Sequence, residues 1–355
     1  MLAVDGLLID AVSSIIPVGA RCDGPDRPKS PAGQGRSPHR DRPQKRRILK
    51  LDPASDRTPT TAPLLASERA MTAPTTPIVL GYLGPVGTYA EAAATGYAQW
   101  RSAREPFQAE LRPYPSIAKT LEAVALGEVP LVVVPVENSI QGSVTTTLDT
   151  LWQLEGLQVQ QAIVLPIAHV LIAQAADFAA ITTVYSHPQA LAQCQRWIET
   201  HLPNAQAVPT NSTTEALLKV QSQPQAAAIS SERAAMLYDL PVLARHISDC
   251  PENCTRFWAI ARQPAHHEGS HTAIAFSTIN NPGSLLKPLA TLASRDINLC
   301  RIESRPSKRG LGDYVFFLDL EAGQHESRTQ AALQELRDRV EILKVFGSYD
   351  ALALT

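Results

Sequence analysis

The chain has 355 residues, of which 44% are apolar and 19% are charged, and at roughly 150 residues per domain it predicts two or three domains. A formal charge of −2 argues against a strongly basic nucleic-acid-binding protein and a polybasic membrane patch. No apolar run reaches the roughly 18 residues of a membrane-spanning helix. Five scattered cysteines do not form a disulfide framework, which favours a reducing, cytoplasmic location.

The N-terminal part of the chain has the composition of a disordered segment. Residues 21–63 are rich in proline, arginine and serine and show no apolar period of a strand or helix. We therefore predict that residues 1–77 form a disordered extension. Asp5 and Asp10 interrupt the apolar start, which argues against a secretory signal. An open alternative is that synthesis begins at Met71 and that residues 1–70 are not translated in the cell.

From Ile78 onward, short apolar runs alternate with helical stretches. Strands are expected at residues 78–83, 131–134, 159–165, 170–173, 182–185, 226–229 and 257–261. Helices are expected at residues 88–100, 116–126, 144–154, 188–201, 213–220 and 232–237. This alternation predicts an α/β architecture with mostly parallel sheets, in which ligands bind beyond the carboxyl ends of strands.

A polar segment, residues 263–270, is predicted to be a linker. Beyond it the patterns predict strands at 271–277, 297–304, 314–320 and 341–347. Helices are expected at 284–295 and 328–340. The order βαββαβ is that of a ferredoxin-like unit.

The first chemistry-bearing segment contains Gly84, Gly87 and Thr88, between a predicted strand and a predicted helix. Glycine lets the backbone approach a ligand, and the free N–H groups at a helix start favour anions. The alternative is a simple turn with Thr88 as the N-cap residue. The spacing fits neither a dinucleotide-binding fingerprint nor a phosphate-binding Walker loop.

Three further polar segments lie where strands end and helices begin. Glu137, Asn138 and Ser139 are expected just after the strand 131–134, although Ser139 could instead cap a helix. Gln189 is expected in the first turn of a helix that begins at Pro188, either facing a cleft or exposed. Residues 210–215 have the pattern of a capping box.

The last such segment is Asn253-Cys254-Thr255-Arg256-Phe257. Arg256 could form a two-pronged pair with a carboxylate, or it could be an ordinary surface arginine. Cys250 and Cys254 are spaced too widely for a C-x-x-C zinc motif, and no metal or cofactor is expected.

Taken in order, these segments resemble the motifs of prephenate dehydratase, a family of phenylalanine biosynthesis. The similarity lies in Gly84-Pro85-x-Gly87-Thr88, in Glu137-Asn138-Ser139 with Gly142 and Thr147-Leu148-Asp149, and in Asn253-x-Thr255-Arg256-Phe257. The last region is similar to the family's ACT regulatory domain at Pro282–Leu285 and Ile297–Pro306. The resemblance covers about residues 78–349. Departures from the family pattern occur at Ala90, Ser284 and Cys300.

The resemblance implies a two-lobed catalytic domain at residues 78–262, like a type II periplasmic binding protein, with the active site between the lobes. One lobe would hold residues 78–165 and a return near 247–262, and the other residues 166–246. A ferredoxin-like ACT domain would follow at residues 271–350. The implied reaction is the decarboxylative dehydration of prephenate to phenylpyruvate, with feedback inhibition by phenylalanine. Arogenate dehydratase and a non-catalytic amino-acid-sensing protein remain alternatives.

The resemblance also assigns site residues. The implied catalytic residues are Thr255 as hydrogen-bond donor, Arg256 for substrate carboxylates, and Glu137, Asn138, Ser139 and Gln189. The implied substrate-binding residues are Gly84, Gly87, Thr88, Asn253 and Phe257. The implied phenylalanine site comprises Gly283, Ser284, Leu285, Asn298, Leu299, Glu303, Ser304, Arg305 and Pro306. A homodimer or homotetramer is implied, and a chain ending near Arg262 is expected to keep some activity and lose sensitivity to phenylalanine.

Overall fold

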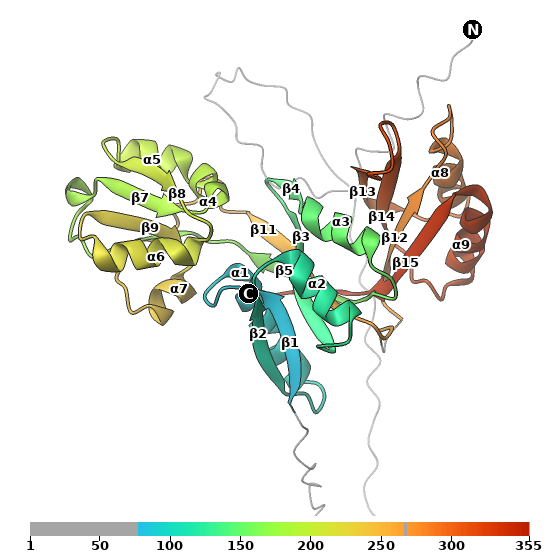
Figure 1. The fold of residues 1–355 in the computed structure, drawn as a ribbon, viewed down its shortest axis with the longest axis horizontal. Coiled ribbons are helices and arrows are strands. Elements are labelled where there is room, and N and C mark those ends of the chain that lie inside the picture. The colour runs from blue at the N-terminus through green and yellow to red at the C-terminus, as the bar shows by residue number, and fades with distance from the viewer. Residues whose placement is uncertain (1–76, 266–267, 355) are drawn as a thin grey trace, which may run out of the picture. The chain divides into compact units, whose positions relative to one another are not determined.

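The computed structural model describes residues 77–265 and 268–354. The predicted disordered extension, apart from Pro77, and the alternative start at Met71 lie outside these ranges. Within them the strands form three sheets (Figure 1).

The first sheet has the order β16-β5-β11-β3-β1-β2, with β4 paired to β3. Its strands are β1 (Ile78–Leu83), β2 (Ala109–Tyr114), β3 (Leu131–Asn138), β4 (Gly142–Ser143), β5 (Gln158–Pro166), β11 (Cys254–Ala261) and β16 (Ala351–Ala353). Its helices are α1 (Tyr89–Ser102), α2 (Ile117–Ala125) and α3 (Thr145–Gln153). In the central strand β3, Val133 packs in the cluster that contains α1 residues, while Val132 and Val134 pack with α2 and α3 residues. Burial on both faces explains the continuous apolar run of β3.

The second sheet has the order β10-β6-β9-β7-β8. Its strands are β6 (Val170–Ala173), β7 (Thr183–Ser186), β8 (Gln206–Pro209), β9 (Ala226–Ser230) and β10 (Val242–Ala244). Its helices are α4 (Pro188–Gln193), α5 (Gln195–His201), α6 (Thr213–Ser222) and α7 (Glu232–Leu237), with a short 3₁₀ turn at Phe178–Ala180.

The strand pairing is mixed, so the prediction of mostly parallel sheets is wrong. β11 is antiparallel to both β3 and β5, and β6 is antiparallel to both β9 and β10. The chain leaves the first sheet at β5 to build the second sheet and returns through β11. The direction of the returning strand is therefore opposite to that of its neighbours.

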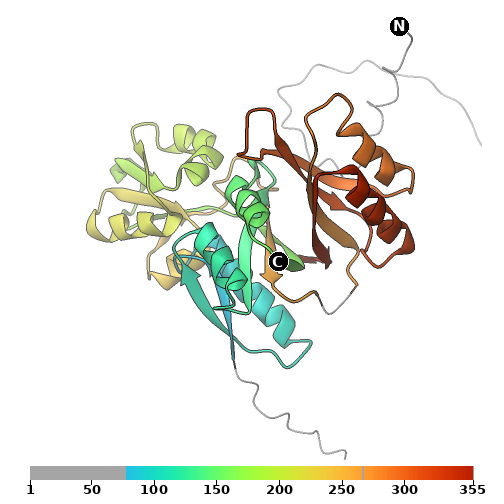
Figure 2. The same ribbon diagram turned by 45° about the vertical axis from the view of Figure 1, so that its right-hand side comes forward.

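The third sheet has the order β13-β14-β12-β15, and every pairing in it is antiparallel. It comprises β12 (His271–Ser277), β13 (Leu299–Pro306), β14 (Tyr314–Leu320) and β15 (Ile342–Tyr349), with α8 (Leu286–Ala293) and α9 (Ser327–Arg339). Both helices lie on the same side of this sheet (Figures 1 and 2). The element order is the βαββαβ that the sequence predicts.

The C-terminal sheet shares a hydrophobic core with the first sheet. Val134 and Trp258 from the first sheet belong to the same buried cluster as Phe317, Phe346 and Tyr349 from the third. After β15 the chain returns to the first sheet, where β16 pairs with β5 in parallel. A chain ending near Arg262 would expose this apolar surface, so the expectation that such a chain keeps its function has no support in the packing.

Candidate active site

The strands β3 and β11 bring two of the predicted segments together. Thr255 lies opposite Asn138, and Arg256 lies opposite Glu137. Side chains of neighbouring residues in a strand point to opposite faces, so the first pair occupies one face and the second pair the other. β3 extends through Asn138, which corrects the expectation that Glu137 and Asn138 follow the strand. Its polar residues Glu137 and Asn138 still belong to the strand because they pair with β11 on one side and with β4 on the other.

On the first face, buried amide groups and a hydroxyl form a closed hydrogen-bond network. Asn138 Nδ2 donates to Thr255 Oγ1 at 3.0 Å and to Asn253 Oδ1 at 2.8 Å. Asn253 Nδ2 donates to Gln193 Oε1 at 3.0 Å. Gln193 Nε2 donates to Asn138 Oδ1 at 3.4 Å. We call Asn138, Gln193, Asn253 and Thr255 the amide ring.

The amide ring orients the Thr255 hydroxyl. Among the described residues, Asn138 is the only hydrogen-bond partner of Thr255 Oγ1. Since that oxygen accepts from Asn138, its own hydrogen remains available to a substrate. A hydroxyl that already accepts a hydrogen bond is also polarised toward donation. The geometry therefore makes Thr255 an oriented donor.

Gln193 and His169 were not anticipated from the sequence. The predicted residue Gln189 is only half-buried, while Gln193, one helical turn later, is buried in the amide ring. His169 Nε2 lies 2.9 Å from Gln193 Oε1, and because an amide oxygen only accepts, the imidazole donates. Burial lowers the pKa of His169. Gln193 could have been found from the sequence, because it lies four residues after Gln189 and therefore on the same face of the predicted helix.

Ser139 serves the architecture of the site. Its hydroxyl accepts from the backbone N–H of Cys254 at 3.0 Å and donates to Asn253 Oδ1 at 3.3 Å. Its backbone N–H donates to the Cys254 carbonyl. Ser139 thus ties the end of β3 to the start of β11.

The glycine-rich segment is a turn in which the N–H groups of Gly84 and Gly87 are engaged. Gly87 has φ +88°, and its N–H donates to Glu91 Oε2 at 2.9 Å. Thr88 is the N-cap residue of α1 and accepts from the Glu91 N–H. The Gly84 N–H donates to the Tyr114 carbonyl. The Gly87 N–H is therefore not free for a substrate carboxylate, because Glu91 accepts from it in a capping arrangement. That other N–H groups near Thr88 hold a substrate carboxylate stays a prediction.

This turn also touches the second sheet's lobe. Glu91 forms an ion pair with Arg233 at 2.7 Å. A Cβ atom at Gly87 would lie only 2.9 Å from Thr214 Cγ2. The hydroxyl of Tyr89 donates to the Ala168 carbonyl at 2.7 Å. The two lobes are in contact next to the amide ring, whose four residues are at most 8% exposed.

On the second face of β11, Arg256 is directed at the C-terminal domain. Its Nη1 lies 3.0 Å from Asp319 Oδ2, and its Nη2 lies 3.6 Å from Glu137 Oε2. Burial opposes the charge of Arg256, but Asp319, Tyr349 and Glu137 raise its pKa overall. This placement differs from the expected contact with a substrate carboxylate. Phe257 is also not a lining residue, because it is buried in the core beside α1.

The residues expected to bind phenylalanine fall into two groups. Gly283, Ser284 and Leu285 precede α8, and a cavity of about 350 Å³ lies beside them, next to Asn281 and Lys287. The second group is on and just before β13, and comprises Asn298, Leu299, Glu303, Ser304, Arg305 and Pro306.

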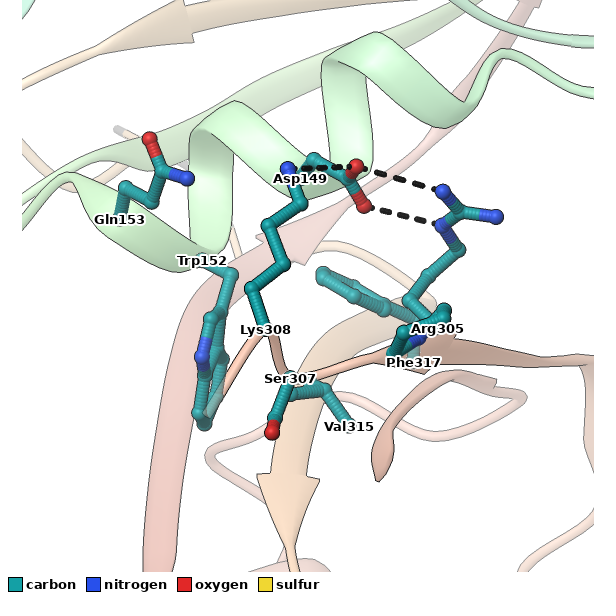
Figure 3. A pocket seen from close by; sticks show the side chains of 9 residues that line it. Asp149, Trp152, Gln153, Arg305, Ser307, Lys308, Val315 and Phe317 are labelled. Carbon is teal, nitrogen blue, oxygen red and sulfur yellow. Dashed lines mark hydrogen bonds and ion pairs between the residues drawn. The ribbon is translucent and has the colours of Figure 1, made fainter. Parts of the chain in front are cut away.

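Several members of the second group have partners of their own. Arg305 pairs with Asp149 of α3 through two contacts of 2.9 and 3.2 Å, and Lys308 lies 3.0 Å from the same carboxylate (Figure 3). The hydrogen bond from Arg305 is the main cause that lowers the pKa of Asp149. Glu303 accepts from the Ser143 hydroxyl at 3.1 Å.

Asn298 and Leu299 are engaged within the C-terminal domain. Asn298 Nδ2 donates to Glu321 Oε2 at 2.8 Å, and Leu299 packs against the core under α8 and α9. Ser304 and Pro306 are exposed.

One cluster in the described residues has the composition of a metal site. The ligand atoms of His271, Cys300 and Glu321 lie within 4.8 Å of one another. Burial raises the pKa of Cys300 to about 11, which disfavours the thiolate that a metal requires. None of the three is part of the amide ring.

These features define a class of protein: a two-lobed α/β enzyme with an oriented hydroxyl donor where the lobes meet, followed by a ferredoxin-like domain. The prephenate dehydratase family model matches residues 80–265, and the chain belongs to this family. In the described residues, no helix has the length and apolar character needed to span a membrane.

Curated relatives and solved structures agree with this assignment. The bifunctional chorismate mutase/prephenate dehydratase of Aquifex aeolicus is 39% identical over 273 residues, covering 77% of this chain and 73% of the relative. The prephenate dehydratase of Amycolatopsis methanolica is 38% identical over 78% of this chain and 90% of its own length. The structure of prephenate dehydratase from Arthrobacter aurescens with L-Phe has a TM-score of 0.70 at 33% identity, covering 77% of this chain and 90% of that one.

A fourth protein of the same fold is described as a novel type of quorum-quenching acylase. It has a TM-score of 0.64 at 28% identity, and the match covers 77% of this chain and 98% of that one. The fold alone therefore does not determine the chemistry, which depends on the arrangement of individual residues.

Proposed function

We propose that this protein converts prephenate to phenylpyruvate and that Thr255 is the hydrogen-bond donor of the reaction. The observation that carries the proposal is the amide ring, in which Asn138 donates to Thr255 Oγ1 and leaves the hydroxyl hydrogen free. The choice of prephenate as the substrate follows from membership of the prephenate dehydratase family.

The reaction needs an oriented substrate and a hydrogen-bond donor for the departing hydroxyl. The bond from the ring carbon to its carboxylate breaks and releases carbon dioxide, and its electron pair enters the ring. The bond from the ring carbon to the hydroxyl oxygen breaks with its electron pair, and the ring becomes aromatic. The hydroxide that leaves takes a proton from solvent to become water. A threonine hydroxyl is a weak acid, so Thr255 acts by donating a hydrogen bond to the departing oxygen. Such assistance is commonly worth about 10²–10⁴-fold in rate.

A directed chain of hydrogen bonds holds the donor. His169 donates to Gln193, Gln193 donates to Asn138, and Asn138 donates to Thr255. Each amide has its remaining oxygen or nitrogen engaged, so the chain cannot reverse without losing buried bonds. This orientation before the substrate arrives lowers the reorganisation that the reaction requires.

The remaining predicted residues take supporting roles in this proposal. Asn253 and Ser139 hold the ends of β3 and β11 together, and Gly84, Gly87 and Thr88 shape the turn that meets the second lobe. Gln189 stays a candidate for substrate contact because its side chain is half-buried at the start of α4.

Phenylalanine is proposed as an inhibitor that binds the C-terminal domain. The relative from Arthrobacter aurescens is described in complex with L-Phe, which supports this effector. The cavity of about 350 Å³ beside Asn281 and Ser284 is large enough for an amino acid, and Lys287 can attract its carboxylate.

A homodimer or homotetramer is proposed through the edge of the C-terminal sheet. β13 is one of the two edge strands of that sheet, and Ile302 on it is 47% exposed. An uncovered edge with an apolar side chain favours pairing with another strand. A cytoplasmic location is supported by the four described cysteines, which form no disulfide.

The test is an assay of purified protein with prephenate, with arogenate, and with both in competition, followed through the formation of the aromatic product. Turnover of prephenate with a higher kcat/KM than arogenate supports the proposal. Preference for arogenate supports arogenate dehydratase. Binding of either compound without turnover supports the non-catalytic alternative.

A further inference from the structure

Four charged side chains join the C-terminal domain to the ends of β3 and β11. Besides its contacts with Asp319 and Glu137 described above, Arg256 has a counterpart in Arg301 of β13. Arg301 Nη1 lies 3.6 Å from Asp319 Oδ2, and Arg301 Nε lies 3.9 Å from Glu137 Oε2. We call Glu137, Arg256, Arg301 and Asp319 the interdomain charge cluster.

The cluster is balanced and mostly buried. It contains two arginines and two carboxylates. Each domain contributes one arginine and one carboxylate. The side chain of Asp319 is 1% exposed and that of Arg301 is 5% exposed. Buried charges are screened little by solvent, so each one depends strongly on the positions of the other three.

The cluster has not reached its best hydrogen-bonded arrangement. Asp319 Oδ1, Arg301 Nε and Arg301 Nη1 are buried and have no hydrogen-bond partner among the described residues. The contacts of Arg301 with Glu137 and Asp319, at 3.6–3.9 Å, are longer than the 2.7–3.2 Å of a normal hydrogen bond. A shift of less than about 1 Å between the two domains would convert such contacts into hydrogen bonds. The buried polar atoms without partners therefore leave room for closer pairings between the two domains.

Each catalytic-domain member of the cluster is a chain neighbour of a member of the amide ring. Glu137 precedes Asn138, and Arg256 follows Thr255, in paired strands. A displacement of the backbone at Glu137 or Arg256 would therefore also move one partner of the Asn138–Thr255 hydrogen bond. A misplacement of about 1 Å at a reacting group can cost about 10²-fold in rate.

We propose that Asp319 and Arg301 are positioning residues through which the C-terminal domain controls the orientation of the Thr255 hydroxyl. The inference rests on the proposed function. Phenylalanine that binds the C-terminal domain would act on the active site by exchanging the pairings of the interdomain charge cluster. Coupling between two such sites is ordinarily 5- to 150-fold in affinity.

The test compares the full-length wild type with Asp319→Asn. Phenylalanine binding is measured by calorimetry, and inhibition of prephenate turnover is measured at the same phenylalanine saturation. We expect the variant to bind phenylalanine. At the same saturation, the factor by which phenylalanine slows prephenate turnover should be at least about tenfold smaller than in the wild type, which is within the ordinary range of coupling. Asp296→Asn, at an exposed turn of the same domain, should behave like the wild type. Wild-type inhibition in Asp319→Asn overturns the proposal.

Asp319→Asn leaves the buried Arg301 without its carboxylate partner, which could destabilise the fold, so a second variant is needed. Arg301→Met combined with Asp319→Leu removes one charge of each sign and leaves Arg256 paired with Glu137. This double variant should fold and should also lose inhibition. If it binds phenylalanine and remains inhibited as the wild type is, the cluster does not transmit the effect.

Hydrogen exchange separates this inference from the proposed function. Phenylalanine should change amide exchange in β3 and β11 of the wild type but not of Asp319→Asn, whatever reaction the site performs. A wild type that leaves prephenate intact yet shows this difference contradicts the proposed function alone. A wild type whose β3 and β11 do not respond to bound phenylalanine overturns the role of the cluster.

Discussion

At the scale of single residues, the chemistry depends on which face of a strand a side chain occupies. Thr255 and Arg256 are neighbours in the sequence, yet one enters the amide ring and the other contacts the C-terminal domain. The resemblance implied a role for both at the substrate. The alternation of side chains along β11 separates them, and only the pairing of β11 with β3 shows which residue faces which way.

Replacing Thr255 by Val should lower kcat by about 10²-fold or more while leaving KM and thermal stability nearly unchanged, because the shape is kept and the donor is lost. Steady-state kinetics on prephenate measure this. Thr255→Ser keeps a hydroxyl and is the matched control, with activity close to the wild type. Near-normal turnover by the Val variant would show that Thr255 is not the donor.

His169 gives the fold a dependence on pH. Burial lowers its pKa, so the folded state holds the neutral imidazole, while the unfolded chain binds a proton below about pH 6.5. Stability is therefore lost as pH falls below that value, by up to about 1.4 kcal/mol per pH unit until the folded pKa is reached.

Urea unfolding of the wild type and of His169→Gln across pH 5–8 tests this prediction. Glutamine can still donate to Gln193, and it does not titrate. The stability of the variant relative to the wild type should rise as pH falls. A difference that stays constant with pH contradicts the assignment.

At the scale of elements, central strands and amphipathic helices were predicted well, and the edge strands of the first two sheets were missed. The apolar runs of β1, β6, β9 and β14 lie where the sequence expects them. β2, with Glu110, Arg112 and Pro113, and β8, with Gln206 and Pro209, carry polar residues and proline because they are edge strands. The helix expected at 188–201 is divided at Cys194, between α4 and α5.

The ion pair between α3 and the end of β13 should stabilise the protein in a pH-dependent way. Arg305 lowers the pKa of Asp149, so its stabilisation is present above the unfolded pKa of about 3.9 and is lost as pH falls through the folded pKa. Asp149→Asn should cost about 1 kcal/mol at pH 7 and progressively less as pH falls below about 3.9, as measured by denaturant unfolding. An equal cost at both pH values would exclude this ion pair as the cause.

The terminal strand β16 should fasten the C-terminal domain to the first sheet. It pairs with β5, and Leu354 beyond it packs against α1, where its Cδ1 would lie 2.5 Å from a Cβ at Gly96. Removing residues 351–355 should cost about 2 kcal/mol and lower Tm by several degrees, as measured by calorimetry. Leu354→Ala should show part of this loss. An unchanged Tm in both variants would mean that β16 adds no stability.

At the scale of the whole molecule, the catalytic and C-terminal parts are not independent bodies within residues 77–265 and 268–354. The shared cluster around Trp258 and Phe317 and the interdomain charge cluster connect them. A chain ending near Arg262 should therefore aggregate or unfold at lower temperature, by exposing Trp258 and leaving Arg256 without Asp319. Light scattering and a thermal scan measure this. A monodisperse truncated chain with wild-type activity would instead support separable domains.

The sequence by itself determined the α/β class, the βαββαβ unit and the family, because periodicity, turn residues and ordered motifs are local properties of the chain. It also pointed to Thr255, Asn138 and Asn253, which lie within those motifs. Only the tertiary structure brought in Gln193 and His169, turned Arg256 toward Asp319, and returned β16 to the first sheet. The physical reason is that these outcomes depend on strand register and on contacts between segments far apart in the chain, which no local pattern encodes.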